Sequence, residues 1–177
     1  MLRLPDTGQT TSYTGTFGED ADFTINAPWF ALNGDGTVTD TITGLMWQQL
    51  DGGEMTIEAA EAYCADLELA GHADWRLPTA HEAFSILNHQ YSNPALDGLV
   101  FTVTDAEYWW TSTRQVGDSN KVWVTNAGGG IGNHPKTETI SAGGLKRFHV
   151  RAVRDVTGPA VLPSHYTLNA DGTATDL

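Results

Sequence analysis

Cysteine, positive charge and long apolar runs are all scarce in this sequence. Its 177 residues include one cysteine, Cys64, so no disulfide can close within the chain. No run of about 18 apolar residues occurs, and the sequence therefore predicts no membrane insertion. Residues 1–8 (MLRLPDTG) lack the apolar core of a signal peptide. We expect either a cytosolic chain or one exported by a signal outside this sequence.

Signatures of catalysis and of cofactor binding are scarce as well. The six histidines show no metal-binding spacing, and no serine lies in a nucleophile elbow. A glycine-rich run at 128–132 (GGGIG) is followed by no helical pattern, so it predicts a surface loop and not a phosphate site. We therefore expect a non-enzymatic protein with no catalytic residue, no metal and no cofactor.

Lysine and arginine number 9 against 22 acidic residues, which gives a formal net charge of −13. Residues 1–113 carry 17 acidic and 2 basic side chains, whereas residues 114–154 carry 7 basic and 2 acidic ones. Two interpretations are open: the basic segment pairs with the acidic body of the chain, or it forms a local face for an anionic ligand. The overall negative field argues against a nucleic-acid partner.

Apolar periodicity predicts two helices. The first covers 57–69 and begins at Thr56 as N-cap, and four of its side chains share one face: Ala60, Tyr63, Cys64 and Leu67. The second covers 79–88 and begins with a capping box of Thr79 and Glu82. We expect Phe84 and Leu87 of this second helix to face the core.

Strand patterns flank and follow the helices. Residues 29–32 and 37–39 surround the turn sequence NGDG at 33–36, which predicts a hairpin, and 45–48 predicts a third strand. Period-two alternation then predicts strands at 107–113, 121–126 and 147–154, the last with Phe148, Val150 and Ala152 inward and Arg147, His149 and Arg151 outward. A long glycine-rich loop is expected at 127–144. The class is α+β.

The turn at 33–40 has a second interpretation. Asn33, Asp35, Thr37 and Asp40 offer oxygens that superficially resemble those of a calcium loop. Gly36 and the β-branched neighbours suit a hairpin better, and no distant glutamate completes the loop pattern. Calcium therefore remains the alternative at this turn.

The ends of the chain differ from its middle. Residues 1–28 are polar and turn-rich and predict an irregular leader, and the domain itself is expected at 29–155. Residues 166–177 repeat residues 30–41 closely, so we interpret 156–177 as a linker and the start of a possible second repeat in a tandem array. The alternative is local reuse of one hairpin sequence within the same sheet.

Five motifs in fixed order carry a family resemblance. They are NGDGTVTD at 33–40, TGLMW at 43–47, WRLPT at 75–79, WWTSTR at 109–114 and VRAVR at 150–154. The series resembles the DUF1566 domain, which is also found at the C-terminus of the Legionella collagen-like adhesin. The resemblance implies a C-type-lectin-like fold, with two helices packed on a twisted antiparallel sheet and a long loop region. This branch is shared with sulfatase-modifying (formylglycine-generating) enzymes and with retroelement-diversified variable proteins.

The resemblance also implies which residues are structural. Trp47, Trp75 and Phe148 lie in framework motifs and are expected to be buried. Many lectin-like domains join the first helix to the last strand by a disulfide, but Ala152 occupies the last strand here. Cys64 is therefore expected to be buried and unpaired. The Glu-Pro-Asn and Gln-Pro-Asp motifs of calcium-dependent lectins are absent, so calcium-mediated sugar binding is not expected.

Function follows as an expectation. We expect a module of a bacterial or phage protein, extracellular or in the cell envelope, that binds a glycan or a protein. The ligand surface is predicted within 109–147, because loops on a rigid scaffold commonly carry recognition. Of Trp109 and Trp110, neighbours on one strand, one should be buried and the other free to stack; the alternative is that all the tryptophans are core. The predicted set is Trp109, Trp110, Ser112, Arg114, Trp123, Asn126, Asn133, His134, Lys136 and Thr137.

Two other functions stay open. One is a structural spacer or assembly domain of a tandem-repeat envelope or fibre protein. The other is a degenerate relative of the formylglycine-generating enzymes, although those enzymes use a cysteine pair and this chain has one cysteine.

Overall fold

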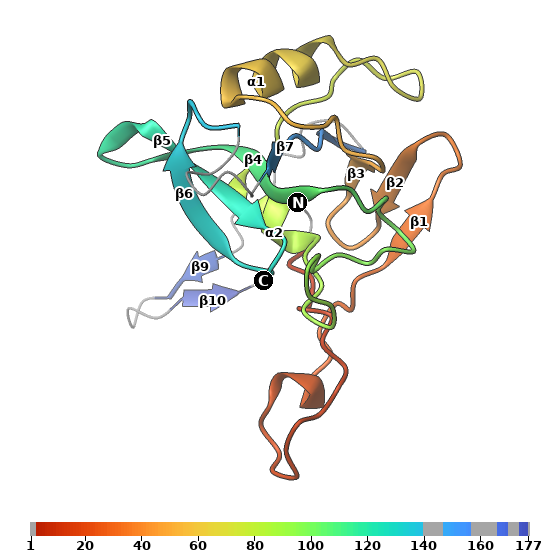
Figure 1. Ribbon diagram of the computed structural model, residues 1–177. Helices are drawn as coiled ribbons and strands as arrows, with labels where there is room; N and C mark the ends of the chain where they lie inside the picture. The colour runs from red at the N-terminus through yellow and green to blue at the C-terminus, as the bar shows by residue number, and fades with distance from the viewer. Residues whose placement is uncertain (1–2, 140–146, 157–165, 170–173, 177) are drawn as a thin grey trace.

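The structure is a computed structural model that describes residues 3–139, 147–156, 166–169 and 174–176 (Figure 1). Two four-stranded sheets, a separate two-stranded sheet and two short helices lie within these residues. The first sheet has the order β1-β2-β3-β8 and is antiparallel throughout. Its strands are β1 (Phe30–Leu32), β2 (Thr37–Asp40), β3 (Leu45–Gln48) and β8 (Val153–Asp155). The predicted hairpin and third strand are confirmed.

The second sheet has the order β6-β5-β4-β7. It contains β4 (Ala106–Gln115), β5 (Asp118–Asn126), β6 (Ile131–Pro135) and β7 (Arg147–His149). Strands β4, β5 and β6 are antiparallel neighbours, but β7 runs parallel to β4. The expectation of a wholly antiparallel set is therefore wrong at β7. Because β7 runs parallel to β4, the chain continues from β7 directly into β8. Strand β8 then pairs with β3 as the last strand of the first sheet.

The predicted strand at 147–154 is two strands in two sheets. Residues 147–149 pair with β4, residues 153–155 pair with β3, and 150–152 cross between the sheets. Gly52 and Gln48 donate backbone hydrogen bonds to Val150 and Ala152 along this crossing. Neighbours on both sides bury His149 and Arg151, which we had expected to face outward.

The helices begin where predicted and end earlier. Helix α1 (Ile57–Asp66) begins at Thr56, whose hydroxyl accepts from the N–H of Ala59. Helix α2 (Ala80–Ser85) begins at the predicted capping box of Thr79 and Glu82. After α1 the chain turns back at 69–72, where Ala70 and Gly71 have positive φ, so helix geometry cannot reach residue 69. A single 3₁₀ turn, η1 (Asp20–Asp22), lies in the leader.

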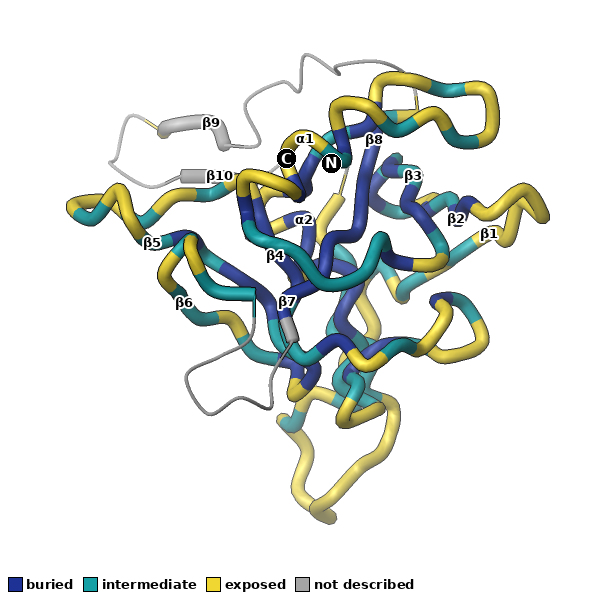
Figure 2. Tube along the Cα trace, turned by 45° about the horizontal axis from the view of Figure 1, so that its top comes forward, coloured by how far each residue is buried: buried dark blue, intermediate teal, exposed yellow. Residues whose placement is uncertain are grey.

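The two helices cover opposite faces of the second sheet. Helix α1 packs Ile57, Ala60 and Cys64 against Trp110, Val124 and other residues of one face. The other face packs Trp109 with Trp47 and with Leu87, which follows α2. Figure 2 shows strands β2, β3 and β8 as largely buried, and the edge strands β1 and β6, the hairpin tips and the leader as intermediate or exposed. The confirmed class is α+β, and its core lies on both sides of one sheet.

The framework residues are buried as expected. Trp47, Trp75 and Phe148 lie in the two core clusters, and Cys64 is buried without a disulfide partner. Leu87 faces inward as predicted, but Phe84 is exposed at the helix surface. Because α2 ends at Ser85, the two residues do not share one helical face.

The glycine-rich region and the tail differ in how far the structure describes them. Residues 131–135 form β6 rather than loop, after a turn at 126–130, and the predicted loop residues 140–146 lie outside the described residues. In the tail, β9 (Tyr166–Leu168) pairs with β10 (Ala174–Asp176) in the same register as β1 with β2. The equal register agrees with the repeated sequence, and the tandem array stays a prediction.

Candidate functional site: a pocket between helix α1 and strand β4

A pocket of about 430 Å³ opens between α1, the WRLPT segment, the start of α2 and strand β4. Its apolar lining is supplied by four side chains: Cys64, Ala65, Trp75 and Leu77. Its polar lining is supplied by five: Glu61, Arg76, Thr79, Glu82 and Ser112. Five of the family-like motif positions therefore meet in one place: Trp75, Arg76, Leu77 and Thr79 of WRLPT, and Ser112 of WWTSTR.

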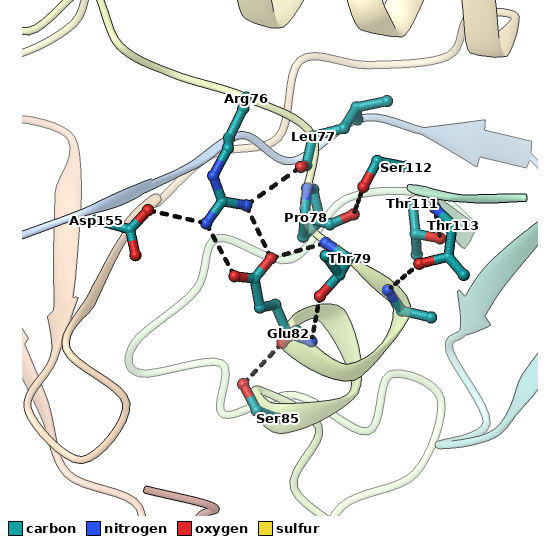
Figure 3. Close-up of polar contacts among 11 residues, drawn as sticks. Arg76, Leu77, Pro78, Thr79, Glu82, Ser85, Thr111, Ser112, Thr113 and Asp155 are labelled. Carbon is teal, nitrogen blue, oxygen red and sulfur yellow. Dashed lines mark hydrogen bonds and ion pairs between the residues drawn. The ribbon is translucent and has the colours of Figure 1, made fainter. Parts of the chain in front are cut away.

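An ion-pair network forms one wall of the pocket (Figure 3). The Arg76 guanidinium contacts both Glu82 carboxylate oxygens at 2.8 Å and Asp155 Oδ2 at 3.1 Å. Glu82 also accepts the N–H of Thr79 at 2.7 Å. Burial alone would raise the pKa of Glu82, but the hydrogen bonds from Arg76 and Thr79 outweigh it and lower that pKa. Both partners are therefore charged at neutral pH.

Hydroxyl groups fix strand β4 to the start of α2. The backbone N–H and the hydroxyl of Ser112 both donate to the carbonyl of Pro78, at 2.8 and 3.2 Å. Thr113 accepts from the N–H of Ala80 at 2.9 Å. Since Pro78 and Ala80 flank the N-cap residue, these bonds hold the helix start against β4 and set the width of the pocket.

A second ion pair lies at the rim of the pocket. Arg114 of β4 contacts Glu61 of α1, and both side chains are partly exposed. Below them Cys64 is buried, and burial raises the pKa of its thiol to about 12. At neutral pH the thiol therefore stays protonated and is a poor nucleophile.

The predicted site residues fall on two faces of the second sheet. Cross-strand register and alternation place Trp110, Val122 and His134 on the face toward α1. Trp109, Trp123 and Asn133 lie on the opposite face. Ser112 and Arg114 join the α1 side at the pocket. The predicted ligand-binding residues therefore do not form one continuous surface.

Neither of the adjacent tryptophans is free to stack. Trp109 and Trp110 are both buried, and Trp123 is half-buried. The expectation of one exposed ring assumed that one face of β4 was open, whereas both faces are covered. His134 packs against the rings of Tyr108 and Phe148, at centroid distances of 4.6 and 5.0 Å.

The polar members of the predicted set have varied surroundings. Asn126 accepts from the N–H of Gly130 and closes the turn before β6. Lys136 lies 4.0 Å from Glu58 of α1, and Thr137 is exposed. Their role in ligand binding stays a prediction.

Basic residues of 114–154 pair with the acidic body of the chain. Four such pairs lie among the described residues: Arg114–Glu61, Lys136–Glu58, Arg151–Asp51 and Arg154–Asp74. This pattern supports the first of the two interpretations of the uneven charge. It leaves less cationic surface for an anionic ligand than the sequence alone indicates.

One buried polar cluster was not predicted. Asp51 accepts hydrogen bonds from His149 at 2.8 Å and Thr104 at 2.6 Å, and Arg151 lies 3.7 Å away. Burial would raise the pKa of Asp51, but its partners outweigh this and lower the pKa from 3.8 to about 2. Asp51 stands in an unremarkable DGG stretch, and alternation assigned His149 and Arg151 to solvent. The sequence carried no signal for their meeting.

The turn considered for calcium is occupied by hydrogen bonds of the chain itself. Asp35 accepts from the backbone N–H and the hydroxyl of Thr37, at 3.1 and 2.6 Å. Asp40 accepts from the N–H groups of Ile42 and Thr43. Among the described residues, no group of three or more His, Cys, Asp or Glu side chains is placed to hold a metal ion.

Comparison with protein families identifies the class of this domain. Residues 36–154 match the family model of the Lcl C-terminal domain, so the chain belongs to this family of adhesin-associated domains. The family is not a known enzyme family. Comparison with curated proteins gives no match, nor does comparison with solved structures.

The matched residues include the pocket described above. The Arg76–Glu82 pair lies within the match, and Asp155 lies directly after it. Among the described helices, none is long and apolar enough to cross a membrane.

Proposed function

We propose that this domain is a recognition module of a surface or secreted protein, and that the pocket between α1 and β4 binds an uncharged saccharide unit. The single observation that carries the proposal is the lining of the pocket. Each carboxylate of its lining contacts an arginine, Glu82 contacting Arg76 and Glu61 contacting Arg114, above an apolar floor.

The chemistry of sugars suits such a lining. Each sugar hydroxyl donates and accepts hydrogen bonds, and guanidinium donors beside carboxylate acceptors serve both needs. The apolar C–H face of a sugar ring can rest on the floor formed by Ala65 and Leu77. A pocket of about 430 Å³ lies within the range of roughly 300–1,000 Å³ that small-molecule sites occupy.

The two arginine–glutamate pairs also favour a neutral ligand over an anionic one. An anionic ligand would have to compete with Glu82 for Arg76 and with Glu61 for Arg114. A neutral ligand can accept from the guanidinium groups while both pairs stay intact. The thiol of Cys64 is buried and protonated, so it is a poor nucleophile. This supports a binding role for the pocket rather than nucleophilic catalysis by Cys64.

A blocked pocket tests the proposal. Neutral saccharides are titrated into the wild-type domain and into Ala65→Trp, whose indole would fill the pocket from exposed helix surface. Ala62→Trp is the matched control, because Ala62 is exposed on the same helix but does not line the pocket. We expect Ala65→Trp to weaken binding by at least about tenfold and Ala62→Trp to leave it unchanged.

Two outcomes would contradict the proposal. If saccharide binding survives Ala65→Trp, the site lies elsewhere on the domain. If no neutral saccharide binds the wild-type domain, saccharide recognition at this pocket is wrong, and the spacer or assembly interpretation gains support.

A further inference from the structure

The pocket between α1 and β4 has a polar side and an apolar side. The polar side lies at the start of α2, where Arg76 contacts Glu82. The apolar side lies under α1, because Cys64 packs with Trp75 and Leu77 in one buried cluster. Apolar atoms make up most of the surface that lines the pocket. A ligand that fits both sides therefore carries an apolar group next to polar ones.

The apolar side presents small groups and no aromatic face. Of the described residues that line the pocket, Trp75 is the aromatic one, and it is 3% exposed. Its indole N–H donates to the carbonyl of His72 at 3.1 Å, so the polar end of the ring is bonded within the chain. The other apolar groups are the thiol of Cys64 and the side chains of Ala65 and Leu77. An exposed aromatic face would supply a broad flat surface for a sugar ring, whereas these groups suit a methyl-sized substituent.

Two hydroxyl groups of the lining adjoin Pro78 (Figure 3). The hydroxyl of Ser112 donates to the carbonyl of Pro78 at 3.2 Å, and its oxygen can still accept hydrogen bonds. The hydroxyl of Thr79 accepts from the N–H of Glu82 at 3.2 Å, a bond that does not use its own proton. One acceptor and one donor therefore lie near each other. An amide group needs this combination, an acceptor for its N–H and a donor for its carbonyl.

We infer that the pocket takes an acetamido sugar. The acetamide methyl group packs against Cys64, Ala65 and Leu77, and the amide is bound by Ser112 and Thr79. The inference rests on the proposed function and narrows it to one class of neutral saccharide. A deoxy sugar would supply a methyl group but no amide for the two hydroxyls.

Matched pairs of sugars test the inference. NMR titrations of the domain compare N-acetylglucosamine with glucose and N-acetylgalactosamine with galactose. A third pair, L-fucose and L-galactose, differs by a hydroxyl whose loss leaves a methyl group and no amide. We expect each acetamido sugar to bind at least about tenfold more tightly than its parent, because it adds a buried methyl group and two hydrogen bonds. L-Fucose should gain less over L-galactose.

A variant separates the amide contact from general sugar binding. Ser112→Ala removes the acceptor for the amide N–H, while the backbone N–H of Ser112 still donates to Pro78 at 2.8 Å and holds the strand in place. We expect the ratio of acetamido to parent affinity to fall by at least about threefold. Ser119→Ala is the matched control, because Ser119 is exposed on β5 and is not among the residues that line the pocket. It should keep the wild-type ratio, and thermal unfolding checks that both variants are folded.

The possible failures differ in what they contradict. Equal affinities within both acetamido pairs would overturn this inference and leave the proposed saccharide site standing. An equal gain from L-fucose would show that the methyl group alone is recognised, so the amide assignment would be wrong. A wild-type affinity ratio in Ser112→Ala would also overturn that assignment. If none of these sugars binds, the inference and the proposed function are both contradicted.

Discussion

The two ion-pair networks of this domain use the same residue types in opposite ways. The network of Asp51, His149 and Arg151 has side chains that are 1–5% exposed. In the pocket network, Arg76 is 38% exposed, Asp155 27% and Glu82 10%. If one member of the Asp51 network is removed, no water can take its place beside the remaining charges. The Arg76 network, in contrast, retains contact with water. The buried network therefore fixes the position of the loops that it connects. The partly exposed network of the pocket can be reached by a ligand.

The largest expected effect comes from breaking the buried network. Asp51→Asn removes the carboxylate charge and leaves Arg151 buried without its ionic partner. We expect a loss of about 3–5 kcal/mol in the free energy of unfolding, the usual cost of removing one member of a buried pair. Chemical denaturation measures it. A loss below about 1 kcal/mol would erase the contrast between the two networks.

The second-largest effect is expected at low pH, where protonation of Asp51 weakens the buried network. Asp51 has a folded-state pKa of about 2 against an ordinary value of 3.8, so its contribution is present above pH 3.8 and lost as pH falls toward 2. The difference corresponds to about 2 kcal/mol. Unfolding free energies measured across this window should fall more steeply for the wild type than for Asp51→Asn. Parallel slopes for the two proteins would contradict the assignment.

A smaller loss is expected at the helix cap beside the pocket network. Thr79→Ala removes the hydroxyl that accepts from the N–H of Glu82 at 3.2 Å. N-cap deletions of this kind cost about 1 kcal/mol, and Thr79→Ser should restore most of it. Thermal unfolding of the three proteins tests the order. A serine variant no better than alanine would show that the threonine methyl group, not the cap, matters.

The smallest effect is expected at the rim pair of the pocket. Arg114→Gln removes the partner of Glu61, but both side chains are 40–44% exposed, so water replaces the interaction. We expect a change below about 1 kcal/mol in the free energy of unfolding. A larger loss in denaturation would place this surface pair in the same class as the buried network.

Local sequence determined the elements that depend on neighbouring residues. The NGDG turn specified the first hairpin because asparagine and glycine tolerate its backbone, and Gly34 and Gly36 do adopt positive φ. Thr56 and Thr79 specified where the helices begin, since a cap acts within one helical turn. The framework motifs also identified Trp47, Trp75 and Phe148 as buried.

The candidate pocket was only partly visible in the sequence. Ser112 and Arg114 belonged to the predicted site, and they do reach the pocket and its rim. Arg76 and Glu82 were recognised only as parts of a motif and a helix cap. Arg76 is fixed in its place by a backbone bridge to Val153 of β8 and by the contact with Asp155, which no local pattern encodes.

Tertiary structure alone decided which faces are covered. Alternation correctly gave Trp109 and Trp110 opposite directions, but only the placement of α1 and α2 on both faces of the second sheet buries both rings. The same holds for His149 and Arg151, whose outward alternation became inward burial where the chain crosses between sheets toward Asp51. Sequence periodicity reports the direction of a side chain along a strand, whereas burial depends on what distant segments pack against that direction.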